Sequence, residues 1–190
     1  MTFRIPVSRS LREWVVNASF GWTARADSDA YRCLHEAGHA QAAILVGAKV
    51  PILEMDATVP GAAARTKIDW GPVWPVAPEK RRMVACAGHA VEHLLFESGR
   101  IRDMRGKSFA TRDFFDYALE NAEQDMTRFF PNTRIGEWTQ SMQQEFGAHS
   151  KTVVQPTLRN RLRQTVALAR LLQAQETMTH DEIESVLASN

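Results

Sequence analysis

The sequence predicts a mainly α-helical protein with a small β-sheet, an α+β fold. Most segments with regular apolar spacing have the period and the end signals of helices, and only two short segments have the character of strands. The chain has 190 residues, of which 44% are hydrophobic and 24% charged, so it suits one compact domain with an ordinary core.

The first strong helix is expected to begin at Asp27 or Ser28 and to end before Gly47, because small polar residues cap helix starts and glycine ends helices. Two short strands follow, over residues 48–57 and 64–70, separated by a proline–glycine turn. The rest of the chain should alternate loops with helices, which we expect over residues 78–96, 111–130, 134–148 and 156–176, with a last short helix from residue 179.

We divide the chain into an N-terminal extension, residues 1–26, and one domain, residues 27–190. Within the extension, residues 8–20 could form a short amphipathic helix that packs on the domain's own core. The net charge of +1 gives no electrostatic reason to expect a nucleic acid as partner, and no apolar run is long enough for a membrane span. The two cysteines, Cys33 and Cys86, form no redox or zinc-ribbon motif, so we expect a cytoplasmic protein with reduced thiols.

A metal-binding motif lies inside the first predicted helix. His35 and His39 are four residues apart, which puts both imidazoles on one helix face, where they can bind the same ion. Glu36 is offset by one residue, where its carboxylate can accept a proton from water at the metal. This H-E-x-x-H pattern predicts a catalytic zinc (Zn²⁺) site that needs one further protein ligand. A metal site without catalysis, or two histidines on an ordinary helix surface, remain as alternatives.

Four segments resemble, in order, motifs of the FtsH family of zinc peptidases. The resemblance spans residues 28–190, nearly the whole chain, and its segments are LHEAGHA at 34–40, AGHAVE at 87–92, ATRDF at 110–114, and LL at 171–172 with ETMTHDEI at 176–183. The first segment is similar to the family's active-site helix, and the third to the segment that supplies its last zinc ligand.

The resemblance implies a zincin-like fold, a zinc-dependent endopeptidase (a hydrolase of the metalloprotease type) and Asp113 as the third zinc ligand. Asp116, one helical turn later, stays open as an alternative ligand. The chain has neither the ATPase module nor the membrane anchor of FtsH proteins, so we expect an ATP-independent peptidase that cuts peptides or unfolded proteins. It could form a homo-oligomer or receive substrates from a separate partner.

A second histidine pair, His89 and His93, has the same spacing. We expect these residues to support the first site or to lie at the surface, with a second metal site as the alternative. One of the two predicted strands could pair with an extended substrate, and Trp70 and Trp74 could line a substrate cleft.

Two other functions compete with a peptidase. One is a non-catalytic regulatory or interaction protein that keeps the metal for stability. The other is a metal-dependent amide hydrolase with one dedicated substrate, which a compact pocket would favour over a long groove.

Overall fold

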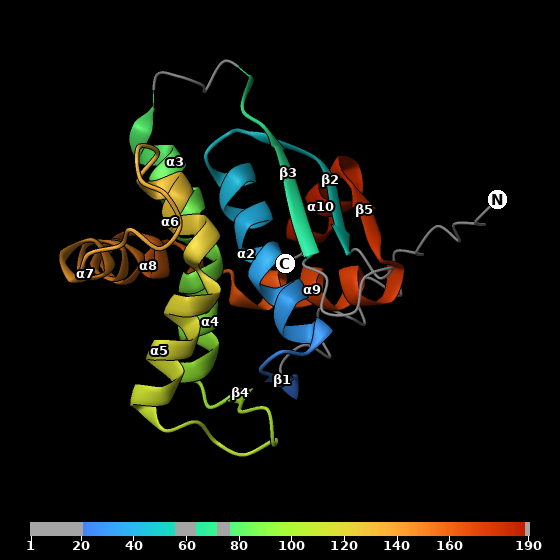
Figure 1. Cartoon of the computed structure of the whole chain (residues 1–190). Coiled ribbons are helices and arrows are strands. Elements are labelled where there is room, and N and C mark those ends of the chain that lie inside the picture. Colours follow the sequence, from blue (N-terminus) through green and yellow to red (C-terminus); the bar gives the residue numbers. More distant parts are fainter. Residues whose placement is uncertain (1–20, 56–63, 72–76, 189–190) are drawn as a thin grey trace.

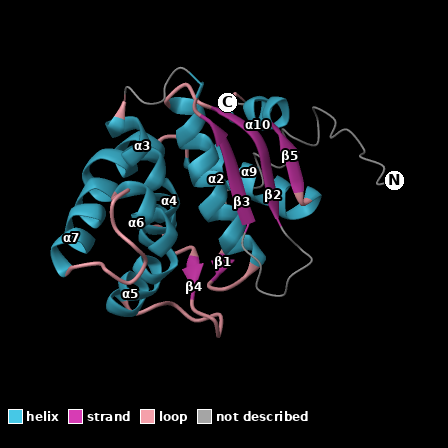
Figure 2. Ribbon diagram, turned by 45° about the horizontal axis from the view of Figure 1, so that its top comes forward, coloured by secondary structure: helices cyan, strands magenta, loops and turns pink. Residues whose placement is uncertain are grey.

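A computed structural model describes residues 21–55, 64–71 and 77–188, and it is mainly helical with two small sheets (Figures 1 and 2). The α-helices are α2 (Asp29–Leu45), α3 (Pro78–Ala85), α4 (Ala87–Glu97), α5 (Thr111–Asn121), α6 (Glu123–Phe129), α7 (Gln140–His149), α8 (Gln155–Arg159), α9 (Leu162–Gln175) and α10 (His180–Leu187), and a π-helix, η3 (Ser150–Val154), joins α7 to α8. The strands are β1 (Ala24–Arg25), β2 (Lys49–Met55), β3 (Ala64–Asp69), β4 (Ile101–Arg102) and β5 (Thr177–Thr179). The helix predicted over 8–20, the proline–glycine turn and Trp74 lie outside the described residues.

Helix α2 forms the centre of the fold, with the three-stranded sheet on one side and α4 on the other (Figure 2). Ser28 caps it as predicted, since its side chain accepts a hydrogen bond from the Tyr31 amide. At Gly38 the two helices come so close that an added Cβ would lie 2.7 Å from Val91 Cγ2 and 2.8 Å from the Ala87 carbonyl oxygen. A glycine in the motif therefore sets the distance between α2 and α4.

The larger sheet has the strand order β3-β2-β5, with both pairings antiparallel. Strands β2 and β3 confirm the two predicted strands, although each is slightly shorter than expected. Strand β5 was not predicted, and it brings the C-terminal part of the chain against β2, where Leu53 pairs with Met178. Because β2 pairs with β5 on one side and with β3 on the other, β3 is an edge strand among the strands that the structure describes. It lies alongside α2.

Two long predicted helices are each broken by a bend. The helix expected over 78–96 is α3 and α4, which meet at Cys86, and the helix expected over 111–130 is α5 and α6, which meet at Ala122. Both junction residues are fully buried, so the apolar pattern continues through each bend and the sequence gives no sign of it. Helix α6, which follows the second bend, carries the buried Asp125.

The core surrounds α2, α4 and α9, and it is built mainly from alanine, leucine, valine and phenylalanine side chains. Within the part of the chain that the structure describes, no helix combines the length and the hydropathy that crossing a membrane requires.

Candidate metal centre

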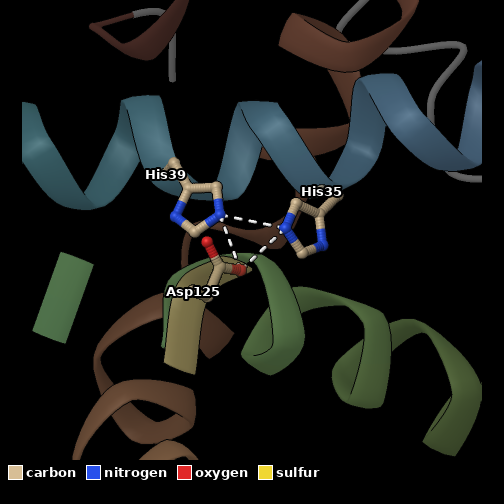
Figure 3. A group of neighbouring side chains, drawn as sticks. All are labelled: His35, His39 and Asp125. Atoms are coloured by element: carbon tan, nitrogen blue, oxygen red, sulfur yellow. Dashed lines mark hydrogen bonds and ion pairs between the residues drawn. The ribbon is translucent and has the colours of Figure 1, made fainter. Parts of the chain in front are cut away.

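Three side chains from two helices converge on one point inside the protein (Figure 3). His35 and His39 come from successive turns of α2, and their Nε2 atoms are 3.0 Å apart. Asp125 comes from α6, and its Oδ2 atom lies 2.9 Å from His35 Nε2 and 3.1 Å from His39 Nε2. All three residues are buried, with exposed fractions of 8%, 3% and 2%. The helical spacing of the motif thus does bring both imidazoles to one place.

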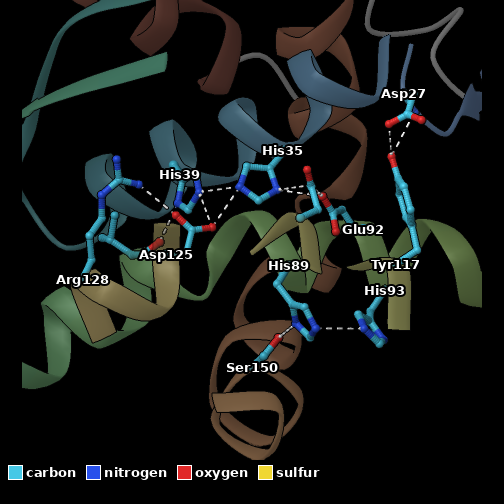
Figure 4. Close-up of polar contacts among 12 residues, drawn as sticks. Asp27, His35, His39, His89, Glu92, His93, Tyr117, Asp125, Arg128 and Ser150 are labelled. Carbon is cyan, nitrogen blue, oxygen red and sulfur yellow. Dashed lines mark hydrogen bonds and ion pairs between the residues drawn. The ribbon is translucent and has the colours of Figure 1, made fainter. Parts of the chain in front are cut away.

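The opposite ring nitrogen of each histidine is held by an acceptor (Figure 4). His39 Nδ1 lies 2.7 Å from the carbonyl oxygen of Val84, which can only accept, so this nitrogen carries a hydrogen. His35 Nδ1 lies 2.7 Å from Glu92 Oε1, and the same oxygen accepts a hydrogen bond from Asn121 Nδ2. These partners leave both Nε2 atoms directed at Asp125, and metal-binding histidines are usually held in the same way by the nitrogen away from the ion.

The charges around the cluster stabilise each other. Burial alone would raise the pKa of Asp125, but the adjacent imidazoles of His39 and His35 lower it well below its ordinary value. Burial alone would lower the pKa of His35, but the carboxylates of Asp125 and Glu92 raise it well above its ordinary value. Arg128 also donates a hydrogen bond to Asp125 Oδ1 at 2.8 Å. Two carboxylates, those of Asp125 and Glu92, therefore contact the imidazoles of the group, and a cation at the Nε2 atoms would interact favourably with both.

The donor set fits zinc. Two imidazole nitrogens and one carboxylate oxygen are a common set of protein ligands for catalytic zinc. Ligand atoms at about 2.0–2.1 Å from a tetrahedral ion are about 3.3–3.4 Å apart, and the three separations here are 2.9–3.1 Å. Three polar atoms this close to one another need a shared proton or a cation between them, so the group could hold a metal ion.

Gly88 on α4 makes room for the ring of His35. A Cβ atom at this position would lie 2.5 Å from both His35 Cε1 and His35 Nε2. Any side chain would therefore displace the imidazole that the cluster needs. The AGHAVE segment thus contributes both this gap and Glu92, one turn later on the same helix.

The carboxylate of Glu36 is hydrogen-bonded to a residue that lines a cavity next to His39. Thr66 on β3 donates a hydrogen bond to Glu36 Oε2 at 2.6 Å. The cavity has a volume of about 370 Å³, and Thr66 and His39 are both among the residues that line it. Ile68 lines it too, because alternate residues of β3 point to the same side of the sheet, and so does Trp70, directly after the strand. The other lining residues come from α3, α6 and the segment after α6: Arg81, Val84, Ala85, Arg128 and Pro131.

The two carboxylates expected as the third ligand lie outside the cluster. Asp113 is exposed in the first turn of α5, and Asp116 is also exposed, with its carboxylate 3.9 Å from Arg112. Neither belongs to the cluster, whose carboxylate comes from Asp125. The bend at Ala122 turns α6 toward α2, so a residue one helix further along the chain reaches the histidines. The sequence did carry a signal, because Asp125 is three residues after Ala122 and four before Phe129 and so shares a helix face with these apolar residues.

His89 and His93 form a second pair on α4, apart from the cluster. Among the described residues, the only group of three or more potential metal ligands is the first one, His35, His39 and Asp125.

A scan against protein-family models and a search of curated proteins found no match to this chain. The resemblance to FtsH peptidases therefore stays a prediction from the motifs.

Proposed function

We propose that this protein is a zinc-dependent endopeptidase with a zincin-like fold similar to the FtsH peptidase domain. The observation that carries the proposal is the convergence of His35, His39 and Asp125 on one point. His39 lines a cavity there, and so does Thr66, which is hydrogen-bonded to Glu36. The resemblance of the motifs to FtsH supports it, with Asp125 in the place expected of Asp113.

Each residue would have a distinct task. His35, His39 and Asp125 would hold the ion, which when bound polarises a carbonyl and makes water a stronger acid near neutral pH. Glu36 would accept a proton from the attacking water and return it to the leaving amine. Thr66 would orient the carboxylate of Glu36 through its hydrogen bond.

The substrate would lie along β3. This strand is at the edge of the sheet order β3-β2-β5, where an extended peptide can add as a further strand. Thr66 and Ile68 on β3 and Trp70 directly after it line the cavity, which would take a side chain of the peptide. A small amide as the dedicated substrate is the second candidate, because a cavity of about 370 Å³ also suits a small molecule.

The test is the substitution Glu36→Gln, which keeps the shape of the side chain and removes its basicity. Cleavage of casein and of fluorogenic peptides by the zinc-loaded protein should fall at least about 100-fold, since general-base catalysis contributes about 10² to 10⁴. Zinc content, measured by mass spectrometry, should stay at the wild-type value. Activity on small amides but not on peptides would favour the second candidate, and a wild-type protein that cleaves neither would contradict the enzymatic proposal.

A further inference from the structure

The second histidine pair has a geometry close to that of the first. His89 and His93 are also four residues apart on one helix, and their Nε2 atoms are 3.1 Å apart, against 3.0 Å for His35 and His39. Two ligand nitrogens of a tetrahedral ion are about 3.3–3.4 Å apart. The second pair therefore already has nearly the separation that a shared ion requires.

His89 is held in this position from behind. Its Nδ1 atom lies 2.9 Å from Ser150 Oγ, and Ser150 is the first residue of the π-helix η3 (Figure 4). His89 is 5% exposed and Ser150 is fully buried. π-Helical turns are rare and occur often at functional sites. Because Ser150 holds Nδ1 of His89, Nε2 of the same ring is directed at His93. Glu92 has the same relation to Nδ1 of His35 in the first site.

The pair opens onto a cavity of its own. This cavity has a volume of about 470 Å³ and lies between α4, α5 and the segment from α7 to α8. His89, His93 and Glu97 line it from successive turns of α4, and Phe115 stacks on the ring of His93 with ring centres 5.0 Å apart. The opposite wall carries polar side chains, Gln140, Gln143, Gln144, Lys151 and Gln155. An ion between the imidazoles would thus have room and polar groups for its remaining ligands.

The nitrogen donors of the pair suit a transition-metal ion. A metal ion binds the neutral imidazole ring, through the lone pair of a ring nitrogen. Nitrogen ligands favour the late first-row ions, among them zinc, nickel and copper, over magnesium or calcium.

We propose that His89 and His93 form a second metal site, which binds a divalent late transition-metal ion through their Nε2 atoms and leaves its other positions open to the cavity of about 470 Å³. With two histidine ligands, and with the carboxylate of Glu97 at the same cavity paired to Arg159, this site should bind more weakly than the first and exchange its ion more readily. The proposal does not depend on peptidase activity.

The experiment counts bound zinc in the full chain. The protein is stripped with a chelator and titrated with zinc chloride by isothermal calorimetry, with mass spectrometry of the dialysed sample as an independent count. The wild type should bind two equivalents, and His93→Gln should lose the weaker one and keep the tighter one. His35→Ala with His39→Ala should lose the tighter one and keep the weaker one. His180→Gln, at a histidine on α10 outside both sites, is the matched control and should still bind two.

Two outcomes would overturn the proposal: a wild type that saturates at one equivalent, or a His93→Gln protein that still binds two. Imidazole NMR of the wild type gives a test that needs no variant to fold, since the resonances of His89 and His93 should shift with the second equivalent of zinc. Glu36→Gln separates the two proposals, because it should abolish cleavage and still bind two equivalents.

Discussion

The two histidine pairs have nearly the same internal geometry and differ in the residues that surround them. His35 and His39 on α2, and His89 and His93 on α4, have the same spacing and nearly the same separation of Nε2 atoms. The first pair faces the buried carboxylate of Asp125, and a second carboxylate, Glu92, lies behind His35. The second pair is anchored by the neutral Ser150 hydroxyl.

This difference shifts the pKa values of His35 and His89 in opposite directions. Nearby carboxylates raise the pKa of His35 against the effect of burial, whereas burial prevails at His89 and lowers its pKa. Helical spacing therefore sets the distance between the two imidazoles of a pair, and residues from other helices set the charge around them. Substitutions around the two pairs test that distinction.

The largest effect should come from Asp125→Asn, which removes the charge of the proposed third ligand and keeps its size. Zinc affinity of the first site should fall by more than about 100-fold, the upper end of the loss seen when an outer partner of a ligand is removed. Asp113→Asn is the matched control: it lies on the exposed first turn of α5 and should leave the affinity unchanged. Calorimetric titration with zinc measures both, and a loss at Asp113 instead would contradict the geometry.

Gly88→Ala should disturb the first pair from the side of α4. Its Cβ would lie 2.5 Å from the ring of His35, so the free energy of unfolding should drop by about 1–3 kcal/mol, as in other overpacked cores, and zinc should bind more weakly.

Gly147→Ala provides the comparison for that substitution. Its Cβ would meet nothing within 4 Å, and alanine in a helix should stabilise the protein by about 0.5–1 kcal/mol. Urea denaturation measures both variants, and equal effects would show that Gly88 is not needed for the close approach to His35.

The smallest effect concerns pH in the metal-free protein. The raised pKa of His35 means that its contribution to stability is complete below about pH 6.5 and is lost as the pH rises through the folded-state value. The lowered pKa of His93 acts in the opposite direction, with stability present above about pH 6.5 and lost as the pH falls toward about 4.

Imidazole NMR titrations should therefore find His35 protonated at a pH where His93 is neutral. Glu92→Gln should lower the pKa of His35 and leave that of His93 where it is, because Glu92 is hydrogen-bonded to the ring of His35 and does not shift the pKa of His93. His35 and His93 rings that titrate together would refute the electrostatic contrast.

Much of the local structure could be predicted from the sequence. The cap at Ser28, the course of α2 and the positions of β2 and β3 follow from residue types and spacing within a few turns of chain. The bend at Ala122 could not be predicted, because buried residues continue the apolar pattern across it.

The sequence by itself determined that His35 and His39 share one face of a helix with Glu36 beside them, because helical geometry depends only on neighbouring residues. Only the tertiary structure decided that Asp125, 86 residues beyond His39, completes the group and that Glu92 anchors His35. Those contacts depend on how closely α4 approaches α2 and on the direction in which α6 leaves the bend. Packing between distant segments sets both, and motif spacing does not encode it.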